Sequence, residues 1–294
     1  MPLILPHGHP ARGAFAEAAG TGAAPPVRVG IVNIMPRLES YEPLLLGPLS
    51  RLTRDVEPIF LRLESHAYGS SDHGHLDRFY RTPNAALAEG RLDGLVITGA
   101  PVEEIPFEEV HYWSELVQLF EVARSRVAST LGLCWGGMAL GGWLDIPKVL
   151  FEQKLFGVYE NRRLEAEHPL LGTQDEVFRC AHSRHSGVRD VDLERAASEG
   201  RVRLLSHSGA TGYTMFETPD HRFVMHLGHP EYVAERISFE WERDRSLGRA
   251  DVKPPHDFDP AQPTTSWASH RERLFESWVR FIAPPAPPPP APKR

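Results

Sequence analysis

Near the middle of the chain stands the segment Ser129-Thr130-Leu131-Gly132-Leu133-Cys134-Trp135-Gly136-Gly137. Its first half is a short apolar run, which predicts a buried strand. Its second half has the pattern Gly-x-Cys-x-Gly and leads into a helix-compatible segment, as in a nucleophile elbow. The glycines allow a tight turn, and the helix start places free N–H groups and the positive end of the helix dipole beside the sulfur. Because this setting favours the reactive thiolate, we expect Cys134 to be a nucleophile rather than a small core residue.

Outward from this segment, apolar runs alternate with segments of helical periodicity. Strands are predicted at 27–35, 56–63 and 92–100, helices at 41–52 and 107–126, and a surface excursion at 65–80. This alternation predicts an α/β fold with a doubly wound, mostly parallel sheet and flanking helices. Ligands bind at the carboxyl ends of the strands in such sheets. Met35-Pro36, Gly99-Ala100-Pro101 and Cys134 all lie at predicted strand ends.

The second half of the chain is less regular. Short strands, some antiparallel, are predicted at 176–181, 202–206, 212–217 and 222–227, and helices at 234–247 and 266–282. We take residues 27–282 as a single domain. An extended or loosely packed arm rich in Ala, Gly and Pro precedes it at 1–26, and a disordered, polyproline-like tail follows at 283–294. The sequence contains neither of the Gly-rich phosphate-loop patterns.

The composition bounds the kinds of partner. With 41% hydrophobic and 24% charged residues, the 294-residue chain resembles an ordinary soluble globular protein. Its net charge of −7 provides no basic field for nucleic acid or an anionic membrane. We find no apolar run of the roughly 20 residues that span a bilayer and no signal-peptide pattern. Two distant cysteines form neither a disulfide framework nor a zinc site, so we expect a cytoplasmic protein without a metal or a bound cofactor.

A cysteine nucleophile needs a base, and the base needs an orienting group. His229-Pro230-Glu231 follows the predicted strand at 222–227, and side chains two residues apart on an extended segment point the same way. The candidate triad is therefore Cys134, His229 and Glu231. The alternative is that His229 is one histidine among 15 and Glu231 a surface carboxylate.

Other groups could assist a reaction at Cys134. The backbone N–H of Trp135, directly after the cysteine, is a candidate donor to an oxyanion, and a second could come from the turn at 100–102. Arg243 lies on the predicted helix at 234–247 and could bind a substrate carboxylate, which suits the geometry of a guanidinium. Cys180 is interpreted as structural.

Taken together, these motifs resemble those of the MetA-type homoserine O-acyltransferases, which share a fold with class I glutamine amidotransferases. The resemblance runs from about Val29 to Phe281. It rests on Ile34-Met35-Pro36, Gly94 to Pro101, Phe107 to Val110 with Tyr112-Trp113, Ser129-Thr130 to Gly136, Ile146-Pro147-Lys148, Lys154-Leu155 with Gly157 to Glu160, His182-Ser183-Arg184, and Gly228 to Tyr232. It implies a class I glutamine amidotransferase-like, flavodoxin-like fold.

The resemblance also implies roles for individual residues. Cys134 would carry the acyl group as a thioester, with His229 as proton acceptor and Glu231 orienting it. Lys154, Ser183 and Arg243 would bind substrate, and Arg243 would hold the carboxylate of the amino acid. In this family, glycine at the position of Glu103 goes with succinyl-CoA and glutamate goes with acetyl-CoA. A carboxylate there would repel a succinyl carboxylate and tolerate an acetyl group.

Two stretches depart from the family pattern. The segment Met35 to Glu42 lacks one lysine of the usual Met-Pro-Lys-Lys, and Gly136-Gly137-Met138-Ala139 replaces the usual Gly-Ala-Gln-Ala. The implied function is ping-pong acyl transfer from acetyl-CoA to the side-chain hydroxyl of L-homoserine, giving O-acetyl-L-homoserine for methionine synthesis. Succinyl-CoA as donor, L-serine as acceptor, a glutamine amidotransferase-like hydrolase and a non-catalytic member of the fold remain open. The oligomeric state is also open, with a homodimer among the candidates.

Overall fold

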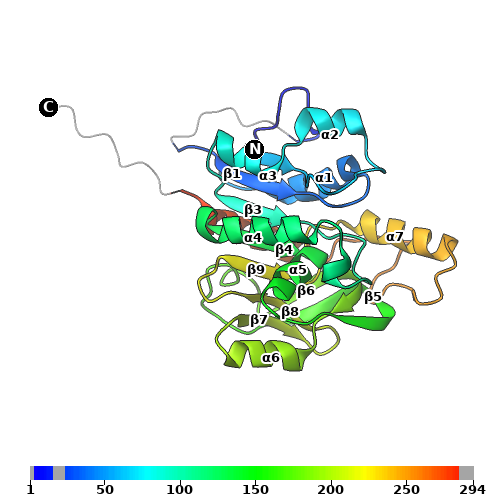
Figure 1. Cartoon of the computed structure of the whole chain (residues 1–294). Coiled ribbons are helices and arrows are strands. Elements are labelled where there is room, and N and C mark those ends of the chain that lie inside the picture. The colour runs from blue at the N-terminus through cyan, green and yellow to red at the C-terminus, as the bar shows by residue number, and fades with distance from the viewer. Residues whose placement is uncertain (1–2, 16–23, 285–294) are drawn as a thin grey trace.

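The computed structural model describes residues 3–15 and 24–284 and is built around one sheet (Figure 1). Within these residues the sheet has nine strands in the order β2-β1-β3-β4-β9-β8-β7-β5-β6. The strands are β1 (Val27–Val32), β2 (Val56–Leu61), β3 (Gly94–Ile97), β4 (Ser129–Leu133), β5 (Val149–Arg163), β6 (Val177–Gly187), β7 (Arg203–Ser208), β8 (Gly212–Glu217) and β9 (Phe223–His226). The α-helices are α1 (Leu38–Leu49), α2 (His73–Phe79), α3 (Pro83–Glu89), α4 (Trp113–Arg126), α5 (Trp135–Trp143), α6 (Asp190–Ser198), α7 (Ala234–Ser246) and α8 (Ala268–Ile282).

The parallel part of the sheet is made by the strands that the sequence marks most clearly. β2, β1, β3, β4 and β9 run parallel to one another. β3 and β4 are buried along their whole length, as expected of apolar strands that helices cover on both faces. β8, β7, β5 and β6 extend the sheet with antiparallel pairs. The predicted doubly wound α/β fold is therefore confirmed.

Helices cover both faces of the sheet and bury two apolar clusters. One cluster includes side chains of α1 and α8, and the other includes side chains of α4 and α5. In Figure 1, α4 lies across the central strands, while α7 projects to one side. α8 packs very closely on β3, because a Cβ at Gly94 would lie 2.4 Å from Cδ1 of Ile282. Trp278 of α8 also donates a hydrogen bond of 3.2 Å from Nε1 to Ser129 Oγ on β4.

The interpretation of residues 65–80 as a surface excursion is wrong in part, because the segment contains α2. The Asp72 side chain caps this helix by accepting hydrogen bonds from the N–H groups of Gly74 and His75. Leu76 and Phe79 on its inner face are buried. A helix of seven residues is too short to produce a periodic pattern that stands out in the sequence.

Among the described residues, two α-helices and one strand also lie outside the predicted elements. α3 and α6 are short helices, and β5 is a long strand that pairs with β6. Within β5, the residues between Leu150 and Leu155 leave the regular register with β6. The strand therefore does not alternate regularly between apolar and polar residues, and periodicity alone could not identify it.

The ends of the chain are described in part. Residues 3–15 of the predicted arm lie against the sheet, where Leu3 forms a parallel bridge with Val56 and both Leu5 and His9 are buried. Residues 16–23 of the arm and residues 285–294 of the predicted tail lie outside the described residues. Across the described ranges, no helix combines the length and the apolar character needed to cross a membrane.

Candidate active site

Cys134 occupies a sharp corner between β4 and α5. Its backbone has φ 49° and ψ −113°, a conformation that is strained for a residue with a side chain. A Cβ at Gly136 would lie 2.4 Å from the carbonyl oxygen of Ile97, and one at Gly132 would lie 2.6 Å from that of Gly136. The glycines are therefore needed because the start of α5 presses directly on β3 and β4. This is the geometry of a nucleophile elbow.

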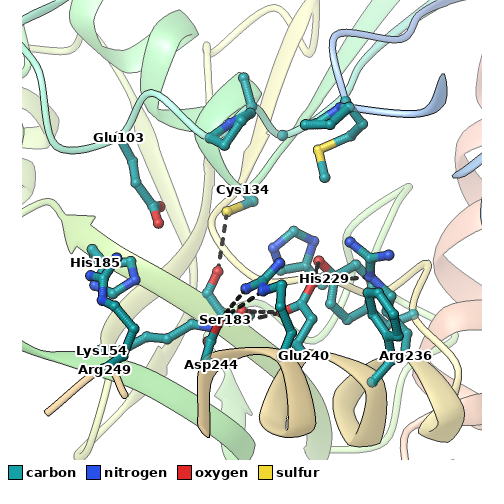
Figure 2. A pocket seen from close by; sticks show the side chains of 18 of the residues that line it. Glu103, Cys134, Lys154, Ser183, His185, His229, Arg236, Glu240, Asp244 and Arg249 are labelled. Carbon is teal, nitrogen blue, oxygen red and sulfur yellow. Dashed lines mark hydrogen bonds and ion pairs between the residues drawn. The ribbon is translucent and has the colours of Figure 1, made fainter. Parts of the chain in front are cut away.

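His229 and Glu231 follow the end of β9, beside this corner. The Nδ1 atom of His229 lies 2.7 Å from Glu231 Oε1, and both side chains are buried. A Cβ at Gly99 would lie 3.5 Å from both Cys134 Cβ and His229 Cε1, so the cysteine and the histidine border the same small space. The structure thus brings together the three residues that the sequence predicted as a triad. Figure 2 shows two of them, Cys134 and His229.

The charge state of His229 follows from its two partners. Burial alone would lower the pKa of this imidazole. The charges of Cys134 and Glu231, together with the hydrogen bond to Glu231, outweigh burial and raise the pKa of His229 well above its usual value. The arrangement therefore favours the protonated imidazolium form of His229.

Above these residues lies a pocket of about 310 Å³. The carboxyl ends of several strands and one face of α7 form its walls, as expected for the ligand site of an open α/β sheet. Figure 2 shows Cys134 and Glu103 on one side of this pocket, facing Glu240 and Asp244 on the other. The lining residues include Met35, Arg37, Gly99, Glu103, Cys134, Lys154, Ser183, His229, Arg236, Glu240, Arg243 and Asp244.

Lys154 comes from β5 and is held by the acidic side chains of α7. Its Nζ atom lies 2.7 Å from Asp244 Oδ2 and 3.7 Å from Glu240 Oε2. Arg243, which is 42% exposed, pairs with the other oxygen of Asp244 at 2.6 Å. The predicted substrate-binding residues Lys154 and Arg243 thus meet at one carboxylate, on the side of the pocket opposite Cys134.

Glu240 is the centre of this wall. Ser183 Oγ donates to its Oε2 at 2.5 Å, and Tyr232 OH donates to its Oε1 at 2.8 Å. Arg236 Nε also lies 3.0 Å from Oε1. Burial would raise the pKa of Glu240, but the charges of Lys154 and Arg236 outweigh it and lower the value to about 2. Glu240 is therefore a fully ionised carboxylate beside the pocket.

Sequence reasoning missed Glu240, Asp244 and Arg236. These residues share the predicted helix at 234–247 with Arg243, at spacings of three and four residues, and such spacings place side chains on one helix face. Acidic and basic residues alternate along this face directly after His229 and Glu231. That pattern was the signal that could have identified them.

Glu103 and Trp135 were also predicted site residues. The side chain of Glu103 lines the pocket, and its pKa is raised by burial, which the backbone N–H of His185 and the charge of His229 oppose. Lys148 Nζ donates to the main-chain oxygens of Glu103 and Ile105, which holds this loop. Trp135 is the first residue of α5, so its N–H has no acceptor within the helix.

Among the described residues, three largely buried groups of histidines with acidic or thiol side chains could be mistaken for metal centres. They are Cys180 with His226 and His270, His9 with Glu42 and His75, and His168 with Glu217 and His221. In each group one Nδ1 accepts a backbone N–H: His226 from Gly228, His9 from Ala11 and His168 from Leu170. Such a neutral imidazole carries its proton on Nε2, the atom that faces the group. These hydrogen bonds favour polar clusters over metal ligation.

Comparisons with known proteins identify the family. The model of the family described as homoserine O-succinyltransferase matches residues 13–286. A protein named homoserine O-acetyltransferase from Geobacillus sp. is 36% identical over 261 residues, covering 87% of this chain and 85% of the relative. One with the same name from Bacillus cereus is 35% identical over 295 residues, covering 96% of this chain and 97% of the relative.

Solved structures share the fold. A protein from Thermoplasma acidophilum described as a putative GMP synthase superposes with a TM-score of 0.55 at 13% identity, covering 88% of this chain and 94% of that one. A glutamine amidotransferase from Thermotoga maritima superposes with a TM-score of 0.53 at 14% identity, covering 87% and 95%. At these identities the likeness concerns the fold alone. Matched along nearly its whole length by the family model, the chain belongs to the homoserine O-succinyltransferase family.

Proposed function

We propose that this chain transfers an acetyl group from acetyl-CoA to the side-chain hydroxyl of L-homoserine through a thioester on Cys134. The observation that carries the proposal is the meeting of a strained elbow cysteine with the His229–Glu231 pair in one pocket. The names of the relatives, homoserine O-acetyltransferase in Geobacillus and Bacillus cereus, support the acceptor and the donor. The product, O-acetyl-L-homoserine, would serve methionine synthesis.

In the first half-reaction, the thiolate of Cys134 attacks the thioester carbonyl of acetyl-CoA. The bond between carbonyl carbon and CoA sulfur breaks, and CoA leaves as a thiol after taking the proton of the His229 imidazolium. Because the pKa of His229 is raised, the imidazole carries this proton before the reaction begins. The N–H of Trp135, at the start of α5, would stabilise the oxyanion of the tetrahedral intermediate.

In the second half-reaction, the homoserine hydroxyl attacks the acetyl-cysteine and gives its proton to His229. The imidazole must now be neutral, and it is left neutral when CoA takes its proton in the first half-reaction. Among the groups that raise the pKa of His229, the charge of Cys134 is the largest, and this charge disappears when the sulfur is acylated. Acylation therefore lowers the pKa of His229 and converts it from an acid into the general base that a hydroxyl nucleophile requires.

The donor is proposed on the basis of Glu103. Its side chain lines the pocket that Cys134 shares, so a succinyl group on the sulfur would bring a second carboxylate toward it. Two like charges in a partly buried site repel one another, and the bulk of Glu103 also shortens the pocket. An acetyl group meets neither obstacle.

The acceptor is proposed to bind along α7. Arg243 is partly exposed at the pocket and can form a bidentate contact with the carboxylate of an amino acid. Glu240 and Asp244 can receive its ammonium group. Lys154 and Ser183, which hold these two carboxylates, would shape the acceptor site rather than contact the acceptor carboxylate themselves.

The test is the intact mass of the protein after mixing with acetyl-CoA or succinyl-CoA in the absence of an acceptor, with Cys134→Ala as control. We expect an acetyl adduct that the control lacks and that L-homoserine, but not L-serine, removes. A succinyl adduct would overturn the donor, and removal by serine would overturn the acceptor. Glutaminase activity without any adduct would favour an amidotransferase-like hydrolase instead.

A further inference from the structure

One strong contact to the candidate triad comes from outside the motifs that suggest catalysis. Tyr41 lies on α1, in the stretch where the chain departs from the family pattern, and its hydroxyl donates a hydrogen bond of 2.5 Å to Glu231 Oε1. The same oxygen also forms a hydrogen bond of 2.7 Å with His229 Nδ1. The other oxygen of Glu231, Oε2, is buried and has no hydrogen-bond partner within residues 3–15 and 24–284. Tyr41 and His229 therefore compete for one oxygen of one buried carboxylate.

Neighbouring groups keep Tyr41 protonated and hold its ring in place. Its side chain is buried, and burial together with the charge of Glu231 raises the pKa of Tyr41 well above its usual value, so it remains a phenol that can only donate to the carboxylate. Its ring packs edge-on against Tyr232 at 6.4 Å, and Tyr232 stacks on the imidazole of His229 at 4.0 Å. Arg236 lies 5.7 Å from the ring of Tyr41. The phenol is thus fixed in place by neighbours that also enclose the histidine.

From this geometry we propose that Tyr41 is a positioning residue that acts through Glu231. The Tyr41 hydroxyl donates to the same oxygen, Oε1, as His229. It therefore fixes the position of the Glu231 carboxylate and weakens the attraction between that carboxylate and the His229 imidazolium. A hydrogen bond to a carboxylate withdraws part of its negative charge, which lowers its ability to stabilise a neighbouring cation. Tyr41 would thereby help His229 to release its proton. The catalytic consequence rests on the proposed function, but the effect on His229 does not.

Other titratable groups also interact electrostatically with His229 or Glu231, and the test must leave these groups unchanged. The acidic ones are Glu103, Cys134, Cys180, Tyr232 and Glu240. The basic ones are His182 and His226, with Arg236 over the ring of Tyr41. Tyr41→Phe removes only the hydroxyl and keeps the ring, so each of these groups keeps its neighbours.

The chain offers a matched control. Tyr80 is also buried, and its hydroxyl donates at 2.8 Å to Glu42, the residue after Tyr41 on α1. Tyr80→Phe therefore removes the same chemical group from a phenol–carboxylate hydrogen bond near the same helix, without touching Glu231. A change that occurs in Tyr41→Phe and not in Tyr80→Phe reports the contact with the triad rather than a loss of packing.

The first experiment is an NMR titration of His229 in the substrate-free protein, with His229→Gln used to assign the signal. We expect the pKa of His229 to be higher in Tyr41→Phe than in the wild type and unchanged in Tyr80→Phe. In the Glu231→Gln background, Tyr41→Phe should produce no further change. An unchanged or lower pKa in Tyr41→Phe overturns the proposal, and so does a shift that persists without the Glu231 carboxylate.

The second experiment measures removal of the acyl group from Cys134 by homoserine as a function of pH. Tyr41→Phe should slow this step about tenfold at pH 6, the size expected for losing one hydrogen bond to a charged group, and the acid limb of the profile should move to higher pH. The rate of acyl-enzyme formation should change less. If the wild type forms no acyl-enzyme at all, the proposed function fails, and the NMR titration still decides the role of Tyr41.

Discussion

The two sides of the pocket are built in different ways. On one side, Cys134, His229 and Glu231 are each at most 4% exposed and are fixed by the ends of parallel strands. On the other, the α7 wall formed by Glu240, Arg243 and Asp244 is held by a set of charges that reaches the surface at Arg243. The first side depends on backbone geometry, and the second depends on the balance of neighbouring charges. We therefore expect substitutions on the first side to lower reaction rates and substitutions on the second side to lower stability.

The largest effect should come from the strand-end side. His229→Ala removes the base that deacylation needs, whereas thiolate attack on a thioester hardly needs one. We expect the rate of acyl transfer to homoserine from pre-formed acyl-enzyme to fall by about 10² to 10⁴-fold, with a smaller loss in acyl-enzyme formation. Rapid-quench measurements of the two half-reactions can separate these rates. Equal losses of rate in both half-reactions would show that deacylation does not depend on His229 more than acylation does.

The next effect should appear on the α7 side as lost stability. Lys154→Met leaves Glu240 and Asp244 without their shared buried cation. Removing one partner of a buried ion pair costs about 3–5 kcal/mol, so the free energy of unfolding should fall by about 3 kcal/mol in urea titrations. Because Lys253 is exposed, Lys253→Met is the matched control and should change stability little.

The folded fraction of Lys154→Met should still form acyl-enzyme, since Cys134 and His229 are untouched. Its KM for homoserine should rise, because the acceptor site loses its shape. A variant that keeps its stability, or that loses acyl-enzyme formation instead, would contradict the separation of the two sides.

The difference between the two sides also explains what the sequence could and could not predict. The elbow around Cys134 and the His229–Glu231 pair follow from local patterns, because glycines and strand ends constrain the backbone within a few residues. The partners of Glu240 come from segments as distant as Lys154 and Ser183, and their meeting depends on how β5 and β6 pack against α7. Local sequence patterns therefore do not predict these contacts.

Tyr41 illustrates the same limit. Its helix was predicted, and its stretch was recognised as a departure from the family pattern, but no local signal joins residue 41 to residue 231. β5 was missed for a related reason, since its register with β6 shifts between Leu150 and Leu155. The sequence therefore indicated which residues lie together where their positions depend on one turn or strand end, and did not where their positions depend on contacts between distant segments.

A smaller effect, on donor choice, should arise at Glu103, which lines the same pocket as Cys134 but belongs to neither the triad nor α7. Glu103→Gly removes both the carboxylate and its bulk. We expect the ratio of succinyl to acetyl adduct, measured by intact mass with both donors present, to rise about tenfold, as for relief of one unfavourable charge contact. Glu104→Gly, at the neighbouring exposed residue, should leave the ratio unchanged. An unchanged ratio in Glu103→Gly would remove the physical basis for acetyl preference.

The last effect is a pH dependence of stability on the α7 side. Glu240 has a pKa of about 2 in the folded protein, below its usual 4.5, because Lys154 and Arg236 outweigh the effect of burial. A carboxyl group with a lowered pKa contributes stability above its unfolded-state value and loses it as the pH falls through the folded-state value. The free energy of unfolding should therefore decline between about pH 5 and pH 2. In Glu240→Gln this decline should be shallower, whereas Glu276→Gln, on the exposed face of α8, should follow the wild type. A Glu240→Gln curve parallel to the wild-type curve would mean that the charges of α7 are not coupled to folding, and the contrast between the two sides of the pocket would then rest on geometry alone.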